Sequence, residues 1–241
     1  MFNPDADAIK KGPWIAFIMV AFFGAFGSSG IPGYWWVYLF VVVVALGFVL
    51  YLVYFCERYT FYVSTLFLSL VGTLAYLFSS FAYLSASGTW GAASFEAVTM
   101  GLVPIVSVVL VYYAIVLTKS AHFPFECAGL KVALREVAKS QSAYSVGIIA
   151  GVTTLTGSMF LKSVDALTSE VVIVLVGSLG CLALLINFRH TIRGLRTLRI
   201  QERSMPIPYT FMRIDEIREA RHRWWLGRFF KWILSLRESH D

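Results

Sequence analysis

The chain has 241 residues, of which 58% are apolar and only 14% are charged, with a net charge of +6. Soluble domains carry charge on roughly a quarter of their residues, so this composition excludes an ordinary soluble protein and indicates a membrane protein. Only 12 acidic or basic residues lie between Trp14 and Phe188, and all of them fall in short connecting stretches or at their edges. The long apolar blocks between them are therefore candidate membrane-spanning helices.

Six stretches are long and apolar enough, or nearly so, to cross the roughly 30 Å hydrocarbon core of a bilayer as helices. They lie at about 13–31, 35–55, 59–84, 97–118, 144–163 and 169–188. The sequence thus predicts an all-α polytopic membrane protein with a tail over 1–12, a six-helix transmembrane domain over 13–188 and a basic tail over 189–241. Only Cys56, Glu57 and Arg58 separate the second span from the third, and the Glu57-Arg58 pair is expected to be a local ion pair or plain surface charge.

The distribution of Lys and Arg predicts the orientation, because these residues are enriched on the cytoplasmic side of membranes. With six spans, 19 of the 20 Lys and Arg residues fall on one face, and only Lys162 falls on the other. We therefore expect both termini to be cytoplasmic. The outer connections are short, which favours a bacterial inner (cytoplasmic) membrane as the location.

Two basic segments follow the fourth and sixth spans. In the loop over 119–143, Lys131, Arg135 and Lys139 repeat every four residues, and apolar side chains gather on another side, a pattern typical of an amphipathic helix on the membrane surface. After the last span the arginines continue at helical spacing, which predicts a basic extension of that helix as far as the Met205-Pro206-Ile207-Pro208 break. Its arginines are Arg189, Arg193, Arg196, Arg199 and Arg203.

The end of the chain combines basic and aromatic side chains over 221–236. On a helix, Arg221, Arg228 and Lys231 share one arc, and the arc beside it carries Trp225, Phe229 and Trp232. This pattern predicts an interfacial helix that contacts anionic lipid headgroups. A docking surface for a cytoplasmic protein is the alternative. Nucleic acid is disfavoured as a partner, because the tether to the last span makes the membrane the nearer anion.

Small residues cluster in three of the predicted spans, where they allow helix backbones to approach closely. They include Gly24, Gly27, Gly147, Gly151, Gly177 and Gly180. The simplest interpretation is packing within one bundle. Association between subunits and a polar pore lining, the latter with the threonines at 153, 154 and 156, remain open as alternatives.

The sequence offers little chemistry. No ionisable residue lies in the middle third of any predicted span, and the three cysteines stand singly, so neither a metal site nor a cofactor is indicated. Gly27-Ser28-Ser29-Gly30 matches the GxSG pattern of intramembrane serine proteases, but no histidine lies at the same predicted depth to act as its base. The sequence predicts a non-enzymatic membrane subunit or scaffold that docks a soluble partner through its basic loop and tail. The alternatives are a homo-oligomeric channel or small-solute transporter and, less favoured, a lipid enzyme that uses His122, Glu126 or His190.

Overall fold

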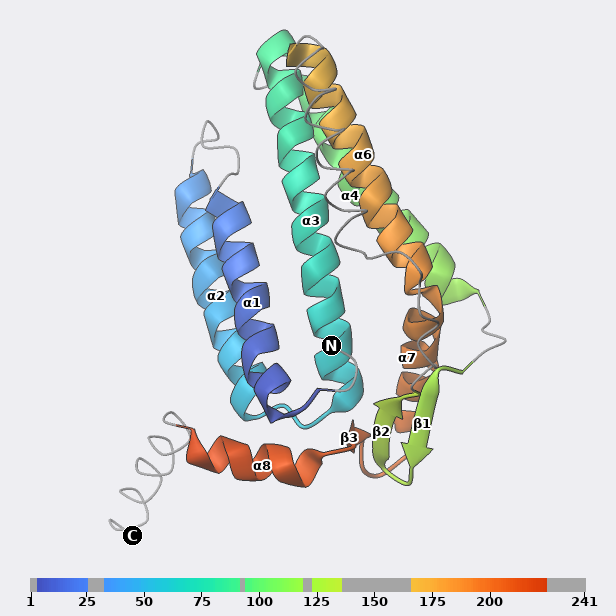
Figure 1. The fold of residues 1–241 in the computed structure, drawn as a ribbon. Helices are drawn as coiled ribbons and strands as arrows, with labels where there is room; N and C mark the ends of the chain where they lie inside the picture. Colours follow the sequence, from blue (N-terminus) through green and yellow to red (C-terminus); the bar gives the residue numbers. More distant parts are fainter. Residues whose placement is uncertain (1–3, 26–32, 92–93, 119–122, 136–165, 225–241) are drawn as a thin grey trace, which may run out of the picture.

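The computed structural model describes residues 4–25, 33–91, 94–118, 123–135 and 166–224 (Figure 1). The apolar stretches form α1 (Ala6–Ala25), α2 (Tyr34–Tyr54), α3 (Tyr59–Trp90), α4 (Phe95–Leu117) and α6 (Ala166–Asn187). The polar segments form β1 (Phe125–Ala128), β2 (Lys131–Leu134), α7 (Arg189–Glu202), β3 (Thr210–Phe211) and α8 (Ile214–Arg223). The described chain is mostly helical, as the sequence predicted.

Four of these helices, α1 to α4, are long and apolar enough to cross a membrane, and a fifth span results if α6 and α7 are counted together. They coincide with five of the six predicted spans, which supports an integral membrane protein. The predicted span at 144–163 lies outside the described residues. α6 does not continue straight into its basic extension, because the helix breaks at Phe188 and α7 turns away from the last part of α6 by 54°.

α3 is the central helix. It packs against α4 and α6 on one side and against α1 on the other, while α2 packs on α1 (Figure 1). One apolar cluster joins Phe67 and Val71 of α3 to Val108 of α4 and to Leu185 of α6. The helix ends follow ordinary local rules: the Ser94 side chain accepts a hydrogen bond from the backbone N–H of Ala97 and so caps α4.

The polar segments build a small sheet at the end of the bundle where α3 begins. β1 and β2 form an antiparallel hairpin, and β3 pairs with β2 in parallel, so that the strand order is β1-β2-β3. Figure 1 shows the sheet beside α7 and shows α8 crossing beneath the ends of α1 and α2. We call residues 123–135 together with 189–224 the basal cap.

The hairpin corrects the prediction of an amphipathic surface helix within 119–143. Lys131 and Arg135 are spaced as on a helix, but Phe125 and Val132 lie on the two paired strands and are buried in one apolar core, at 3% and 1% exposed. Gly129 adopts a φ of +63°, a left-handed conformation that suits a tight turn and not a helix interior. Over the described residues of this loop, 123–135, two four-residue strands joined by this turn therefore stand in place of the helix.

Candidate functional site

An apolar core attaches the basal cap to the helical bundle. It unites side chains from distant segments, with Ile9 in α1, Tyr59 and Tyr62 in α3, and Phe211 and Ile217 in the cap, each at most 1% exposed. The Phe211 ring lies edge-on to the rings of Tyr59 and Tyr62, with centroid distances of 5.7 and 5.3 Å. Full burial of one large apolar side chain contributes about 1.5–3 kcal/mol. Several such contacts make the cap a folded part of the protein.

Gly194 allows α7 to lie close against the hairpin. A Cβ atom at this position would come within 2.8 Å of Pro124 Cδ and 2.7 Å of Phe125 Cε2. Such distances are shorter than normal contacts between carbon atoms. The close approach of the two elements therefore depends on the absence of a side chain at Gly194.

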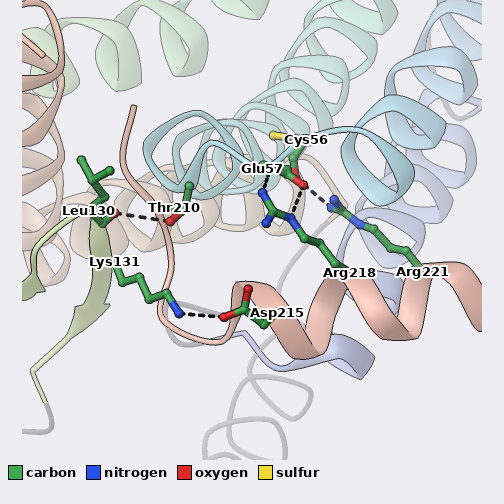
Figure 2. A network of polar contacts seen from close by, with 8 residues as sticks. All are labelled: Cys56, Glu57, Leu130, Lys131, Thr210, Asp215, Arg218 and Arg221. Atoms are coloured by element: carbon green, nitrogen blue, oxygen red, sulfur yellow. Dashed lines mark hydrogen bonds and ion pairs between the residues drawn. The ribbon is translucent and has the colours of Figure 1, made fainter. Parts of the chain in front are cut away.

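Ion pairs hold α8 to the bundle on one side and to the sheet on the other (Figure 2). Arg218 of α8 donates two hydrogen bonds to the Glu57 carboxylate in the α2–α3 turn, at 2.8 and 2.7 Å. Lys131 of β2 donates to Asp215 of α8 at 2.8 Å. The hydrogen bond from Arg218 holds the pKa of Glu57 below its usual range, and Lys131 lowers the pKa of Asp215 in the same way. Both carboxylates are thus held in the charged form.

Arg221 is the buried member of this group. Its side chain donates to the backbone carbonyl of Cys56 at 2.7 Å, and only 8% of the residue is exposed (Figure 2). Burial lowers the pKa of its guanidinium, and within the described chain its Nε atom has no hydrogen-bond partner. Trp224 follows Arg221 by three residues, and Lys10 of α1 lies over its ring, 5.6 Å from the ring centroid. These contacts fix the end of α8 against α1 and the α2–α3 turn.

Glu202, the last residue of α7, connects α7 to the start of α3. Its carboxylate accepts a hydrogen bond from the Thr60 hydroxyl at 2.8 Å and one from the backbone N–H of Tyr209 at 3.1 Å. The backbone N–H of Tyr59 donates to the Tyr209 carbonyl at 2.9 Å. Thr60 is only 2% exposed and Glu202 is half-buried, so the hydroxyl donor of this contact is shielded from solvent.

The arginines of α7 behave differently from the other basic residues of the cap. Arg193 donates to the Ile115 carbonyl at 3.2 Å and to the Thr118 hydroxyl at 2.9 Å, and Arg196 donates to the Val116 carbonyl. These oxygens lie at the C-terminal end of α4, where helix carbonyls lack intrahelical partners and the helix dipole favours positive charge. Within the described ranges, no arginine of α7 is paired with a carboxylate.

Several residues predicted to contact a partner or lipid headgroups make contacts within the basal cap instead. Lys131 pairs with Asp215, Arg135 pairs with Glu126 at 3.0 Å, and Arg221 is buried. Arg189 is exposed and donates to the His190 ring at 3.3 Å. Arg193, Arg196 and Arg199 lie on α7. The remaining predicted contacts lie outside the described residues; they are Lys139, Trp225, Arg228, Phe229, Lys231 and Trp232.

Sequence reasoning missed the long-range partners. Glu57 pairs with Arg218, 161 residues away, whereas the sequence predicted a local ion pair with Arg58 or plain surface charge. The link from Thr60 to Glu202 spans 142 residues. The sequence signal for the pair between Glu57 and Arg218 was an acidic residue in a tight turn between two predicted spans. This signal favours a cationic partner but does not identify which residue it is.

The predicted packing glycines that the structure describes differ in how closely a neighbouring helix approaches them. A Cβ at Gly24 would come within 2.9 Å of the Tyr38 ring of α2, and a Cβ at Gly177 would overlap the Phe78 ring of α3. Both contacts lie within one chain. A Cβ at Gly180 would meet no described atom within 4 Å, so the structure shows no helix contact for it. Gly27, Gly147 and Gly151 are outside the described residues.

A search of the described residues finds no group of three or more His, Cys, Asp or Glu side chains that could hold a metal ion. The cysteines are free thiols, buried at Cys56 and Cys181 and exposed at Cys127. Comparison of the chain with protein-family models, with curated proteins and with solved structures gives no match.

Proposed function

We propose that the chain is a non-enzymatic integral membrane subunit or scaffold that presents its basal cap to a soluble partner. The observation that carries this proposal is the construction of the cap. Segments far apart in the sequence share one apolar core and are cross-linked by ion pairs, which is more structure than loops between spans require. A rigid surface at the membrane boundary suits protein docking, because little conformational entropy is lost on binding.

The exposed side of α8 is the surface that we assign to the partner. Glu216, Glu219 and His222 are exposed there, whereas Ile214 and Ile217 face the core. Opposite charges alternate along this side, since Arg223 pairs with Glu219 and Arg213 lies 4.0 Å from Glu216. Such exposed pairs contribute little to stability and can exchange partners at low cost.

The proposal includes an orientation and a location. We place the basal cap on the cytoplasmic side of a bacterial inner membrane, with both termini on that side, because Lys and Arg gather on the corresponding face of the sequence. Anionic headgroups would then surround the cap. A homo-oligomer is compatible with this arrangement.

Site-specific photo-crosslinking in native membranes tests the proposal. A photoreactive residue replaces Glu216 or His222 in the full chain, and a control variant carries it at Phe40, which is 69% exposed on the apolar helix α2. We expect crosslinks to one soluble protein from α8 and none from Phe40. Purification of a lone monomer after mild solubilisation, without crosslinks from α8, would contradict the proposal.

One cavity favours the second candidate function, a homo-oligomeric channel or small-solute transporter. It has a volume of about 500 Å³, lies between α3, α4 and α6, and is lined mainly by apolar side chains, with Ser85, Thr89, Ser107 and Ser178 among them. Hydroxyl groups can replace the hydration shell of a small solute. Flux in liposomes that falls when Ser107 and Ser178 are replaced by alanine would support this function over the scaffold.

A further inference from the structure

A crevice between α3, α4 and α7 places apolar side chains directly beside two guanidinium groups. Phe67 and Leu68 of α3 and Tyr112 and Val116 of α4 form its apolar part, and Arg196 and Arg199 of α7 lie at its polar end. Its volume is about 90 Å³. It sits where α4 ends, which is the level at which an apolar span gives way to polar surroundings.

The two arginines are available for an external anion. Both are exposed, and in the described part of the chain neither forms an ion pair with a carboxylate. Arg196 is held in place by its hydrogen bond to the Val116 carbonyl. By contrast, Lys131 and Arg135 of the hairpin and Arg218 of α8 are paired with Asp215, Glu126 and Glu57. Among the described residues, Arg196 and Arg199 of α7 are thus exposed and lack a carboxylate partner, whereas Arg221 of α8 is buried.

We propose that this crevice binds one anionic phospholipid. Arg196 and Arg199 receive the phosphate, since guanidinium groups match phosphate oxygens through paired hydrogen bonds. The first part of an acyl chain lies against Phe67, Leu68, Tyr112 and Val116. The crevice is too small for a whole lipid, so the rest of the molecule stays in the bilayer beside α3 and α4.

The apolar lining explains why a lipid fits better than a free phosphate. A soluble anion would contact the arginines alone and would leave the apolar side chains uncovered, whereas a phospholipid satisfies both halves of the crevice. A zwitterionic lipid would bring its own cation near the arginines and gain less from them. The inference concerns a lipid only, so it can hold or fail independently of the soluble partner proposed above.

Lipid binding to the full chain, purified in a neutral detergent, tests the inference. The probe is phosphatidylglycerol, compared with phosphatidylcholine, and bound lipid is counted by native mass spectrometry. The variants are R199Q and R196Q/R199Q. The matched control is R189Q/R203Q, which removes the same charge from exposed positions at the first residue of α7 and at its C-cap, neither of which lines the crevice.

We expect phosphatidylglycerol to bind more tightly than phosphatidylcholine. One basic residue near a lipid surface is worth about 1 kcal/mol, so R199Q should weaken binding roughly 5-fold and R196Q/R199Q about 30-fold. The control variant should bind as the wild type does. Because Arg196 also contacts α4, R199Q alone keeps the test valid if the double variant unfolds.

Three results would overturn the inference. Equal loss in the R189Q/R203Q control would show a general attraction of charge and no site. Equal binding of the two lipids would remove the role of the arginines. Displacement of the lipid by glycerol phosphate at similar concentration would show an anion site to which the apolar crevice contributes nothing.

Discussion

Gly177 and Gly180 lie three residues apart in α6, and the structure predicts opposite results when each is replaced by alanine. A Cβ atom at Gly177 would overlap three atoms of the Phe78 ring in α3, whereas one at Gly180 meets no described atom within 4 Å. Both positions are inside the same helix, so G177A and G180A share the gain in helix propensity, about 1 kcal/mol. The difference between the two variants therefore reports packing alone.

The magnitude follows from the cost of forcing extra atoms into a packed contact. Overpacking costs about 1–3 kcal/mol, which sets the expected difference in unfolding free energy between G177A and G180A. G180A should be as stable as the wild type or up to about 1 kcal/mol more stable. For a chain of this size about 1 kcal/mol shifts the melting temperature by roughly 2–4 °C, so G177A should melt about 2–12 °C below G180A.

The assay is thermal unfolding of the full protein in one detergent at one scan rate, because membrane proteins often unfold irreversibly and the rate then affects the midpoint. Truncation of the ring in F78A should provide space for the new methyl group. The G177A substitution should then cost less in the F78A background, with a coupling of about 0.5–3 kcal/mol. Equal melting of G177A and G180A, or the absence of coupling to Phe78, would refute the assigned contact between α3 and α6.

Other contacts give further predictions. T60V should lower the unfolding free energy by about 1.5–3 kcal/mol, because it removes the buried hydroxyl that donates to the Glu202 carboxylate, whereas T60S keeps the hydroxyl and should lose less. The pKa of Glu57 is lowered in the folded state, so its pairing with Arg218 stabilises the fold at pH values above the unfolded-state pKa of about 4.3. This stabilisation is lost as the pH falls through the lower folded-state pKa. Melting curves recorded over a pH series should show the loss of stability in acid, and E57Q should make the melting temperature less dependent on pH. Cys127 is exposed on β1, so in intact cells an impermeant maleimide should label it only after permeabilisation, and labelling from outside would reverse the proposed orientation.

The spans were predictable because a bilayer imposes one simple requirement, about 20 apolar residues in a helix. α1 to α4 and α6 all fall on stretches that hydropathy selects. The bend at Phe188 was not predictable in this way. It arises where α7 turns to bring Ile192, Leu195 and Leu198 into contacts with α3, α4 and the sheet, which depend on tertiary partners.

The hairpin shows why short polar segments resist such prediction. Over so short a segment, the spacing of four residues between Lys131 and Arg135 fits a helix, and the alternation of buried and less buried side chains around Val132 fits a strand equally well. The decision depends on what Phe125 and Val132 can bury against, and that surface is supplied by Tyr59, Leu195 and Phe211 from other parts of the chain. A turn glycine at Gly129 was the local signal in favour of the hairpin.

A count of Lys and Arg along the sequence treats every basic residue as equivalent, but in the folded chain these residues have different partners. Arg218 and Lys131 are paired with carboxylates and give the basal cap its shape, and Arg221 is buried against a backbone carbonyl. Arg193 and Arg196 stabilise the end of α4 without any carboxylate, so their charge still acts on the surroundings. Positive charge is thus paired with carboxylates at Lys131, Arg135 and Arg218 and is left without a described carboxylate on α7, at the level where α4 ends. Both proposals rest on this division: the paired residues shape the surface that we assign to a soluble partner, and the exposed arginines of α7 form the site that we propose for a lipid.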